Sequence, residues 1–261
     1  MTRFNRIAFA AVVYIVCSSS ALPADVRITE NTSAKAGDRS VQGVRSIYIR
    51  GSRMKIELTQ NNRTTATVFD LPVGALVNLE PEKKRAEIRD IGARNAQLER
   101  SYPRARSSVV LTATGATKVI ADLPCEERAF VVKVPMTKDG ETVLTLTGSA
   151  WTAPSAPGAV DYHAFVQAAV ARELVMGYAS DNAILLAVTR GQTELYRAVG
   201  ALPGIPYMID FVIGVEGKGV VAGMIRKATS GSRTSTVTSV AAAPLSDATF
   251  EIPYDWKRKK K

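Results

Sequence analysis

The sequence has little of the chemistry on which most enzymes and metal sites depend. Its 261 residues include one histidine and two cysteines, and only 7% of them are aromatic. This scarcity excludes a zinc finger and a disulfide-rich miniprotein, because both need several cysteine or histidine side chains. We therefore predict no metal, no cofactor and no enzymatic activity. Hydrophobic residues make up 46% of the chain and charged residues 22%, a composition typical of a globular domain.

Long hydrophobic runs are also missing, apart from one near the start. Ile7–Val16 has ten apolar residues, whereas a helix that crosses a bilayer needs about 20. Arg3 and Arg6 precede this run, and small residues follow it at Ser18–Ala21. The pattern is typical of a secretory signal, so we predict that residues 1–24 direct export to a bacterial periplasm or cell envelope and are removed. An uncleaved N-terminal anchor is the alternative.

One of the two cysteines lies within the predicted signal and the other lies outside it. Cys17 raises the alternative of a lipid anchor, but Val16 precedes it where lipoprotein processing needs a small residue, which argues against acylation. If Cys17 leaves with the signal, Cys125 has no internal partner in an oxidising compartment. We expect Cys125 to be a small buried core residue, since free cysteines are commonly buried.

Positive charge is concentrated at one end of the chain. The formal net charge is +10, and removal of Arg3 and Arg6 leaves +8, of which five charges belong to the last five residues. A nucleic-acid groove would spread basic residues over a folded face, so we predict no nucleic-acid partner. We interpret the end as a solvated basic tail that could contact an anionic membrane surface. The tail comprises Lys257, Arg258, Lys259, Lys260 and Lys261.

Most of the remaining sequence has the period of β-strands. In 53–59, Met54, Ile56 and Leu58 alternate with polar residues, which indicates a sheet with one covered face. The same spacing recurs at Phe130, Val132 and Val134, at Thr142, Leu144 and Leu146, and in the long apolar file Tyr207, Ile209, Phe211, Ile213 and Val215. Turn signals such as Asn61–Asn62, Pro81, Asp139–Gly140 and Gly217–Gly219 separate these runs. We predict about ten to twelve strands, joined mostly as hairpins.

Helical period is confined mainly to an insert at about residues 158–203. An alanine-rich segment from Asp161 to about Met176 predicts one long helix, and 194–201 and 92–100 are shorter candidates. So many antiparallel strands must curl. The predicted fold class is therefore α+β, with a curled antiparallel half-barrel sheet and helices on its concave side. The predicted organisation is a signal at 1–24, a single domain at 25–256 and the tail at 257–261.

Catalytic motifs are not recognisable in the sequence. A serine hydrolase triad would have to use His163, which lies in the alanine-rich helix, where a lone histidine is more often a surface or packing residue. Glu126 and Glu127 are neighbours on one strand and would face opposite ways, so they do not form a natural carboxylate pair. Asp210 lies opposite to Ile209 and Phe211 in strand parity, which favours a surface position.

Several short motifs, in a fixed order over residues 44–256, resemble a known family. They are Tyr48–Gly51, Met54–Glu57, Leu79–Lys84, Pro124–Glu127, Trp151, Pro157–Gly158, Gly204–Tyr207 and Phe250–Pro253. The chain resembles a family of exported bacterial proteins known only as a domain of unknown function, family forty-four-twelve. That family is similar in outline to the outer-membrane lipoprotein carriers. The resemblance implies a curled half-barrel that holds acyl chains between sheet and helices, and it carries over no catalytic residues.

The leading hypothesis is an exported envelope protein that binds a lipid, a lipoprotein acyl chain or another hydrophobic ligand between sheet and helices. Its site would lie on the hydrophobic face, at Met54, Ile56, Leu58, Tyr207, Ile209, Phe211 and Ile213. The same residues could instead pack a dry core, which is the ordinary fate of an apolar face. One alternative function is an envelope interaction module that uses a sheet edge or the basic tail. Another is a hydrolase with an unrecognised site.

Overall fold

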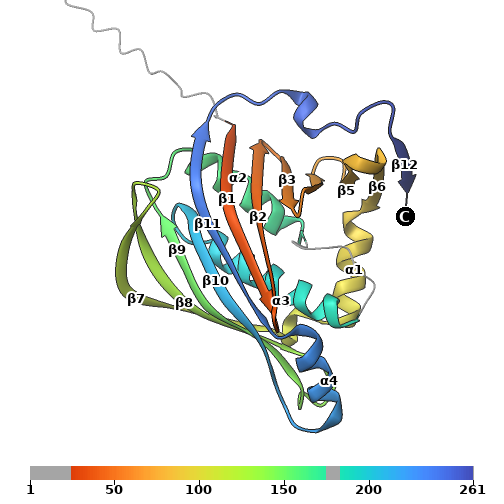
Figure 1. Cartoon of the computed structure of the whole chain (residues 1–261), viewed down its shortest axis with the longest axis vertical. Coiled ribbons are helices and arrows are strands. Elements are labelled where there is room, and N and C mark those ends of the chain that lie inside the picture. Colours follow the sequence, from red (N-terminus) through yellow and green to blue (C-terminus); the bar gives the residue numbers. More distant parts are fainter. Residues whose placement is uncertain (1–24, 175–182, 261) are drawn as a thin grey trace, which may run out of the picture.

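The computed structural model describes residues 25–174 and 183–260, which form an α+β fold (Figure 1). The strands are β1 Val26–Ala36, β2 Arg39–Arg50, β3 Arg53–Gln60, β4 Arg63–Asp70, β5 Ala75–Glu80, β6 Arg85–Asp90, β7 Ser108–Ile120, β8 Leu123–Pro135, β9 Val143–Ala153, β10 Ile205–Glu216, β11 Gly231–Ala242 and β12 Lys257–Lys260. They make one 12-stranded sheet in the order β12-β6-β5-β4-β3-β2-β1-β11-β10-β9-β8-β7. Neighbouring strands are antiparallel except β12 and β6, which run parallel. The sheet therefore consists of two series of sequential antiparallel strands, β1–β6 and β7–β11. The pairing of β1 with β11 joins the two series in the middle of the sheet.

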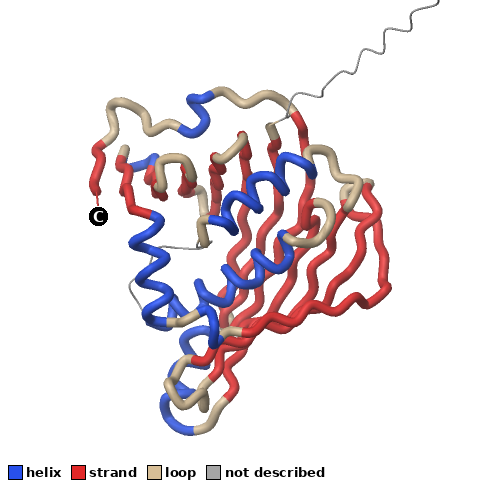
Figure 2. The backbone as a smooth tube through the Cα atoms, turned by 180° about the vertical axis from the view of Figure 1, so that it is seen from behind, coloured by secondary structure: helices blue, strands red, loops and turns tan. Residues whose placement is uncertain are grey.

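The described residues contain four α-helices. They are α1 Ile91–Ser101, α2 Ala159–Ala171, α3 Ala183–Gly200 and α4 Gly219–Thr229, with short 3₁₀ turns at Pro81–Lys83, Arg104–Arg106 and Asp247–Phe250. Figure 2 shows α2 and α3 running across the concave face, with α1 beside them. Helix α4 instead lies at the end of β10, at the bottom of Figure 1. The predicted fold class is thus confirmed.

Alternation of apolar and polar residues gives the sheet a covered inner face and a solvent-exposed outer face. All five residues of the file from Tyr207 to Val215 in β10 are at most 8% exposed, and Phe130, Val132 and Val134 in β8 are at most 2% exposed. Strand pairing keeps these side chains together, since Ile213 lies opposite Leu146 in β9 and Leu146 opposite Val132. The predicted apolar files therefore form the core between sheet and helices.

Two helices differ from their predicted extents. Helix α2 ends at Ala171 rather than near Met176, because Glu173 has a left-handed backbone (φ 52°) and turns the chain. The predicted stop at Gly177 lies outside the described residues. Helix α3 reaches back to Ala183, well before the predicted start at Glu194. Its first six residues are all apolar, and a run of that kind fits a buried strand as well as a helix.

The predicted turn at Gly217–Gly219 is where a further helix begins. Gly217 and Gly219 both have positive φ, which breaks β10, but the chain then forms α4 before β11 starts. This helix was missed because it carries a glycine at 223 and follows a glycine-rich turn, both of which read as loop.

The C-terminal residues differ most from expectation. Lys257–Lys260 pair with β6 as the edge strand β12 instead of forming a free tail, and all four side chains are exposed. The predicted signal and Cys17 lie outside the described residues. In residues 25–174 and 183–260, no helix is long and apolar enough to cross a bilayer.

Candidate ligand-binding site

The inner face of the sheet carries two neighbouring apolar clusters, each under a different helix. The α2 cluster lies beneath α2 and includes Val26, Ile28, Ile49, Met54, Phe69, Phe165, Ala169 and Tyr207. The α3 cluster lies beneath α3 and includes Phe130, Leu144, Leu146, Leu195, Val199, Ile209, Phe211 and Ile213. The clusters divide the predicted ligand-binding face in two.

The two helices cover these clusters to very different degrees. Helix α2 buries only two of its own side chains, Phe165 and Ala169, and Val160 in its first turn is 81% exposed. Helix α3 buries many more, both apolar and polar. They are Leu186, Ala187, Val188, Thr189, Arg190, Thr193, Glu194, Leu195 and Val199. Because burial of apolar surface is what attaches a helix to a sheet, α2 is the more weakly attached cover.

The seven residues predicted to bind a ligand all belong to inner-face positions, but the structure does not bring them into one group. Met54 and Tyr207 are in the α2 cluster, and Ile56 packs against its margin. Ile209, Phe211 and Ile213 belong to the α3 cluster. Leu58 is partly buried on β3, opposite Arg45 of β2. A ligand in contact with all seven would have to lie under both helices.

A group of polar side chains lies on the inner face beneath both helices. Glu30 of β1 and Arg45 of β2 are opposite each other in the sheet and form an ion pair, with side chains 8% and 20% exposed. Burial alone would lower the pKa of Arg45. The charge of Glu30 and the hydroxyl of Tyr196 outweigh burial and raise this pKa above its ordinary value, so Arg45 stays cationic. Burial, with the charge of Glu30 nearby, raises the pKa of the Tyr162 hydroxyl, which stays protonated.

This polar group joins four elements of the fold. It takes Glu30 and Arg45 from the sheet, Tyr162 from α2 and Tyr196 from α3. Sequence analysis missed all four residues. The sequence pattern does indicate Glu30, because this residue continues the apolar file of Val26 and Ile28. A charged side chain within such a file needs a partner when it is buried.

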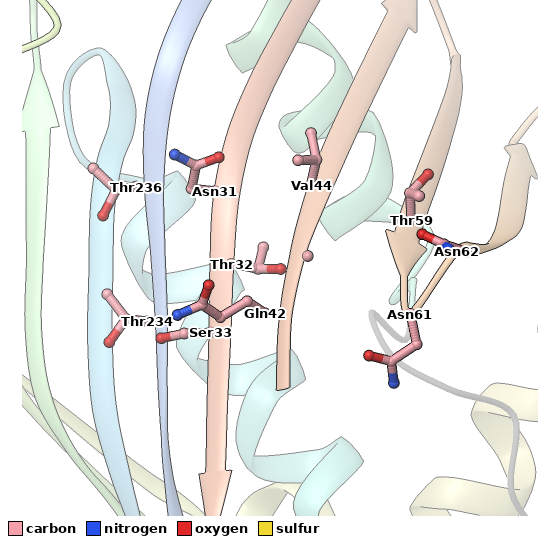
Figure 3. Close-up of a pocket in the computed structure, with 11 residues that line it drawn as sticks. Asn31, Thr32, Ser33, Gln42, Val44, Thr59, Asn61, Asn62, Thr234 and Thr236 are labelled. Carbon is pink, nitrogen blue, oxygen red and sulfur yellow. The ribbon is translucent and has the colours of Figure 1, made fainter. Parts of the chain in front are cut away.

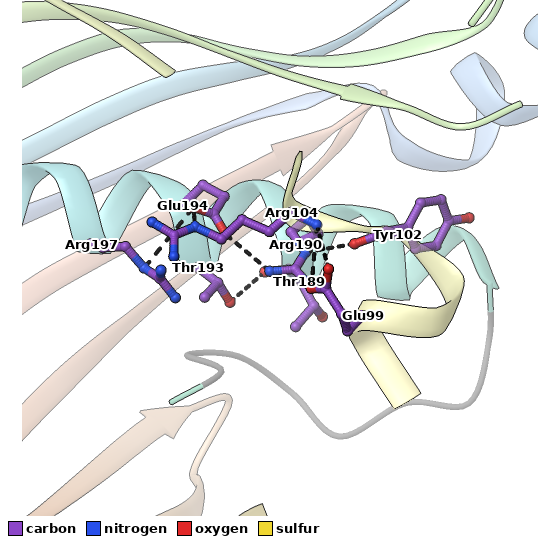
Figure 4. A network of polar contacts seen from close by, with 8 residues as sticks. All are labelled: Glu99, Tyr102, Arg104, Thr189, Arg190, Thr193, Glu194 and Arg197. Carbon is purple, nitrogen blue, oxygen red and sulfur yellow. Dashed lines mark hydrogen bonds and ion pairs between the residues drawn. The ribbon is translucent and has the colours of Figure 1, made fainter. Parts of the chain in front are cut away.

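A second polar network fixes α3 to α1, as Figure 4 shows. The guanidinium of Arg190 in α3 donates to the carbonyl of Tyr102 at 2.9 Å, to Glu194 at 2.9 Å and to Glu99 of α1 at 2.7 Å. Arg104 lies 3.5 Å from Glu194. Burial lowers the pKa of the nearby Arg197, and Glu194 offsets part of that effect. The network therefore makes α3 a fixed part of the scaffold.

Helix α2 is held chiefly at its ends. At its start, Gly158 packs so closely on Val26 that an added Cβ would lie 2.5 Å from a methyl group of that valine. At its end, Asn95 of α1 donates to the carbonyl of Arg172 at 2.9 Å, and Arg172 donates to the carbonyl of Leu71. Between these contacts, Phe165 and Ala169 are buried in the α2 cluster, and Tyr162 and Ala168 pack against it while partly buried. The two left-handed residues, Gly158 and Glu173, bracket the helix.

The residues considered for catalysis have simple surroundings in the structure. His163 stands edge-on to Tyr162, with ring centroids 5.9 Å apart. Within the described residues, no group of three or more histidine, cysteine or carboxylate side chains could hold a metal ion. Cys125 is buried, as expected, and burial raises the pKa of its thiol. Asp210 faces outward, as its parity indicated, and accepts a hydrogen bond from Ser149 Oγ at 2.9 Å.

Two comparisons of the sequence with known proteins give no match. No family model matches it. A comparison with curated proteins gives no match.

Comparison with solved structures gives matches of low identity and low TM-score. A LolA superfamily protein from Nitrosomonas europaea is 10% identical, with a TM-score of 0.32 and coverage of 88% of this chain and 90% of that one. A putative outer membrane lipoprotein-sorting protein domain from Vibrio parahaemolyticus is 7% identical, with a TM-score of 0.36 and coverage of 88% and 91%. A DUF1329 family protein from Desulfovibrio piger is 9% identical, with a TM-score of 0.32 and the same coverage.

Proposed function

We propose that this protein is exported to the cell envelope and holds an acyl chain, or another long apolar ligand, between the inner face of its sheet and α2. The observation that carries the proposal is the contrast between a wide apolar face and the helix above it. Val26, Ile28, Ile49 and Met54 are at most 3% exposed, yet α2 contributes only two buried side chains to their cover. A cover attached by so few contacts can be displaced by a ligand that replaces them.

The energetic cost of lifting α2 is modest. Burial of one phenylalanine side chain contributes about 1.5–3 kcal/mol, and Phe165 is the one large side chain of this helix that is fully buried, with Tyr162 partly buried beside it. An acyl chain that entered the α2 cluster would restore the lost apolar contacts, so the opened form would not leave the sheet face in water. Local opening of this size is common in proteins that bind ligands beneath a mobile element.

The polar group beside the α2 cluster supports an amphiphilic ligand rather than a plain hydrocarbon. A few fixed polar groups at the margin of an apolar site orient a ligand that has one polar end. Arg45 and the hydroxyls of Tyr162 and Tyr196 stand at this position, and Glu30 keeps the guanidinium charged and in place. The proposed site is therefore centred on Met54, Ile56 and Tyr207, while Ile209, Phe211 and Ile213 lie under the fixed helix α3.

Native mass spectrometry and displacement of a fluorescent fatty acid test this proposal. We expect the purified full chain to carry copurifying lipid and to bind the probe. Replacing Ala169, which is 8% exposed and faces the α2 cluster, by tryptophan should fill the site and weaken probe binding at least about tenfold. Val160→Trp, on the same helix at an 81% exposed position, is the matched control and should bind as the native chain does. Lipid-free protein with no probe binding, or equal losses in both variants, would overturn the proposal.

A second candidate function rests on the exposed basic edge of the sheet. Strand β12 presents Lys257, Arg258, Lys259 and Lys260 at one edge, and all four side chains are exposed. Pairing with β6 fixes these charges along one edge strand, where successive side chains point to alternate faces of the sheet. Each basic residue near an anionic bilayer contributes about 1 kcal/mol of attraction, which salt weakens. We propose that this edge brings the protein to an anionic membrane surface.

Vesicle cosedimentation separates this candidate from the first. The double variant Lys257→Glu/Lys259→Glu should lose binding to vesicles that contain phosphatidylglycerol at low salt, yet keep fatty-acid binding. Lys35→Glu/Arg39→Glu, which changes the charge equally at exposed positions of the β1–β2 hairpin, is the control and should retain vesicle binding. Equal effects of both variants would mean that only net charge matters and would contradict a role for the edge.

A further inference from the structure

The outer face of the sheet, opposite the helices, contains a depression of about 580 Å³. It spans four neighbouring strands, β11, β1, β2 and β3, and the turn between β3 and β4 (Figure 3). Strand register aligns its side chains in rows, because Asn31 lies opposite both Thr236 and Val44. Ser33 likewise lies opposite Thr234 and Gln42. The volume is within the range of about 300–1,000 Å³ of small-molecule sites.

The chemistry of the lining is distinctive. None of the 11 residues that line the depression has an ionisable side chain. Nearly all carry a hydroxyl or a carboxamide, groups that both donate and accept hydrogen bonds. In the described part of the chain, the side chains of Asn31, Ser33, Gln42 and Thr234 make no hydrogen bond to another protein group. These groups are therefore available to a ligand that can replace water.

The absence of charge from this lining decides which ligand class fits. A phosphate or carboxylate ligand would need arginine or lysine contacts, and an acyl chain would need an apolar wall. A neutral ligand rich in hydroxyl groups matches alternating donors and acceptors at every position. Val44, 46% exposed within the depression, adds a small apolar surface of the kind that packs against the C–H face of a sugar ring.

The next strand adds a carboxylate and apolar side chains at one side of the depression. Asp210 of β10 lies opposite Thr234, and Met208 lies opposite Thr236. Asp210 is oriented by the hydrogen bond from Ser149, and Ser149 also accepts from Trp151 Nε1 at 3.2 Å. Trp151 lies opposite Met208 and carries Lys118 over its ring at 3.9 Å. A fixed acceptor and a fixed aromatic side chain thus extend the same rows beyond the depression.

We propose that this outer-face depression binds a neutral oligosaccharide, with Asn31, Ser33, Gln42, Thr234 and Thr236 as its hydrogen-bonding residues and Asp210 as an acceptor at its margin. The site is on the opposite face of the sheet from the proposed acyl-chain site. An exported protein that bound both would connect a lipid and a glycan through one sheet. The two proposals stand on separate residues and fail independently.

Isothermal titration with maltotriose, cellotriose and chitotriose tests the proposal on the purified chain. At least one sugar should bind with a Kd of about 1 mM or tighter. The double variant Asn31→Ala/Thr236→Ala removes two adjacent hydrogen-bonding groups and should weaken that binding about tenfold. Ser33→Trp fills the depression and should abolish binding.

The control variant removes the same kind of polar group at positions outside the depression. Thr112→Ala/Thr147→Ala removes two exposed hydroxyls from β7 and β9 on the same outer face, outside the depression, and should leave sugar binding unchanged. All three variants should bind the fluorescent fatty acid as the native chain does. No heat of binding with any of the three sugars at about 10 mM, or equal loss in the control, would overturn the proposal.

Discussion

Gly191 determines how closely α3 approaches the sheet. A Cβ at this position would lie 2.5 Å from a methyl carbon of Leu146 in β9, a side chain that is itself fully buried. Leu146 cannot move away, because Val132 and Ile213 flank it on the neighbouring strands. The absence of a side chain at Gly191 therefore sets the packing of the α3 cluster.

We predict that Gly191→Ala lowers the free energy of unfolding by about 1–3 kcal/mol through overpacking. Gly223→Ala is the matched control, because an added Cβ there has no heavy atom within 4 Å. Since alanine is favoured over glycine inside a helix, Gly223→Ala should raise stability by about 0.5–1 kcal/mol. Urea unfolding of both variants measures the difference, and a stabilised Gly191→Ala would show that α3 can shift freely.

The ion pair of Glu30 and Arg45 gives a second prediction for single residues. Arg45→Met should lower the free energy of unfolding by about 3–5 kcal/mol, because it leaves the carboxylate of Glu30 buried without its partner. The double variant Glu30→Leu/Arg45→Met removes both charges and should recover most of that loss. A double-mutant cycle in urea measures the coupling. If the single and double variants are equally destabilised, the pair is not the source of the effect.

The elements were predictable from the sequence where one residue period governed a whole segment. The strand files at Phe130–Val134 and Tyr207–Val215 form buried faces as predicted, because a period of two fixes which side chains face the helices. The start of α3 was not predictable, since its first six residues, 183–188, are all apolar and such a run fits a buried strand as well as a helix. Strand β12 was hidden for another reason. A run of lysines and an arginine has no apolar alternation, and its strand is formed by pairing with β6.

The candidate site was predictable only in part. Period alone identified Met54 and Tyr207 as inner-face residues, but it could not show that Ile209 and Phe211 lie under a different helix. That division depends on where α2 and α3 cross the sheet, which is a property of tertiary packing. The outer depression was invisible for a similar reason. Isolated serines, threonines and asparagines become a surface only when β1 pairs with β11 and β2.

The attachment of α3 to α1 gives a prediction at the scale of elements. Arg190 has a side chain only 5% exposed and bonds Glu99, Glu194 and the Tyr102 carbonyl. Arg190→Met should lower the free energy of unfolding by about 2–4 kcal/mol, because three charge-assisted or carbonyl hydrogen bonds are lost and a buried carboxylate loses a partner. Hydrogen exchange should also become faster in α1.

An exposed arginine of α1 supplies the comparison for that variant. Arg100→Met, near the end of α1, should change stability by less than about 0.5 kcal/mol and leave exchange in α1 unaltered. If Arg190→Met leaves exchange in α1 at the native rate, the network does not hold the two helices together. In that case α3 would be no more fixed than α2, and the distinction on which the proposed ligand entry rests would fail.

At the scale of the whole molecule, the two ends of the open sheet are protected in different ways. Strand β7 at one edge is interrupted by an irregularity between Ala113 and Thr117, with Gly115 in a left-handed conformation. Strand β12 at the other edge is short and wholly basic. Bulges and edge lysines both oppose strand addition by a second chain. The outer face between these edges thus remains open to solvent and to ligands.

The stability of the whole fold should fall in alkaline solution. Burial raises the pKa of Cys125, Tyr102 and Tyr207 above the ordinary values of 9.0 for cysteine and 10.0 for tyrosine. A group that holds its proton more tightly when folded contributes stability that is complete below its unfolded pKa and is lost as pH rises through its folded pKa. Urea unfolding should therefore show constant contributions from these groups up to about pH 8.5 and a decline above that.

Two tyrosine variants separate this effect from general charge repulsion at high pH. Tyr207 is 2% exposed, and Tyr207→Phe removes an ionising group with little change of shape, so its stability should fall less steeply above pH 10 than that of the native chain. Tyr254 has a ring that is 95% exposed, and Tyr254→Phe should follow the native curve. Parallel curves for all three proteins would show that the hydroxyl of Tyr207 ionises as easily in the fold as in the unfolded chain. The inner face around Tyr207 would then be open to water, which a covered apolar site excludes.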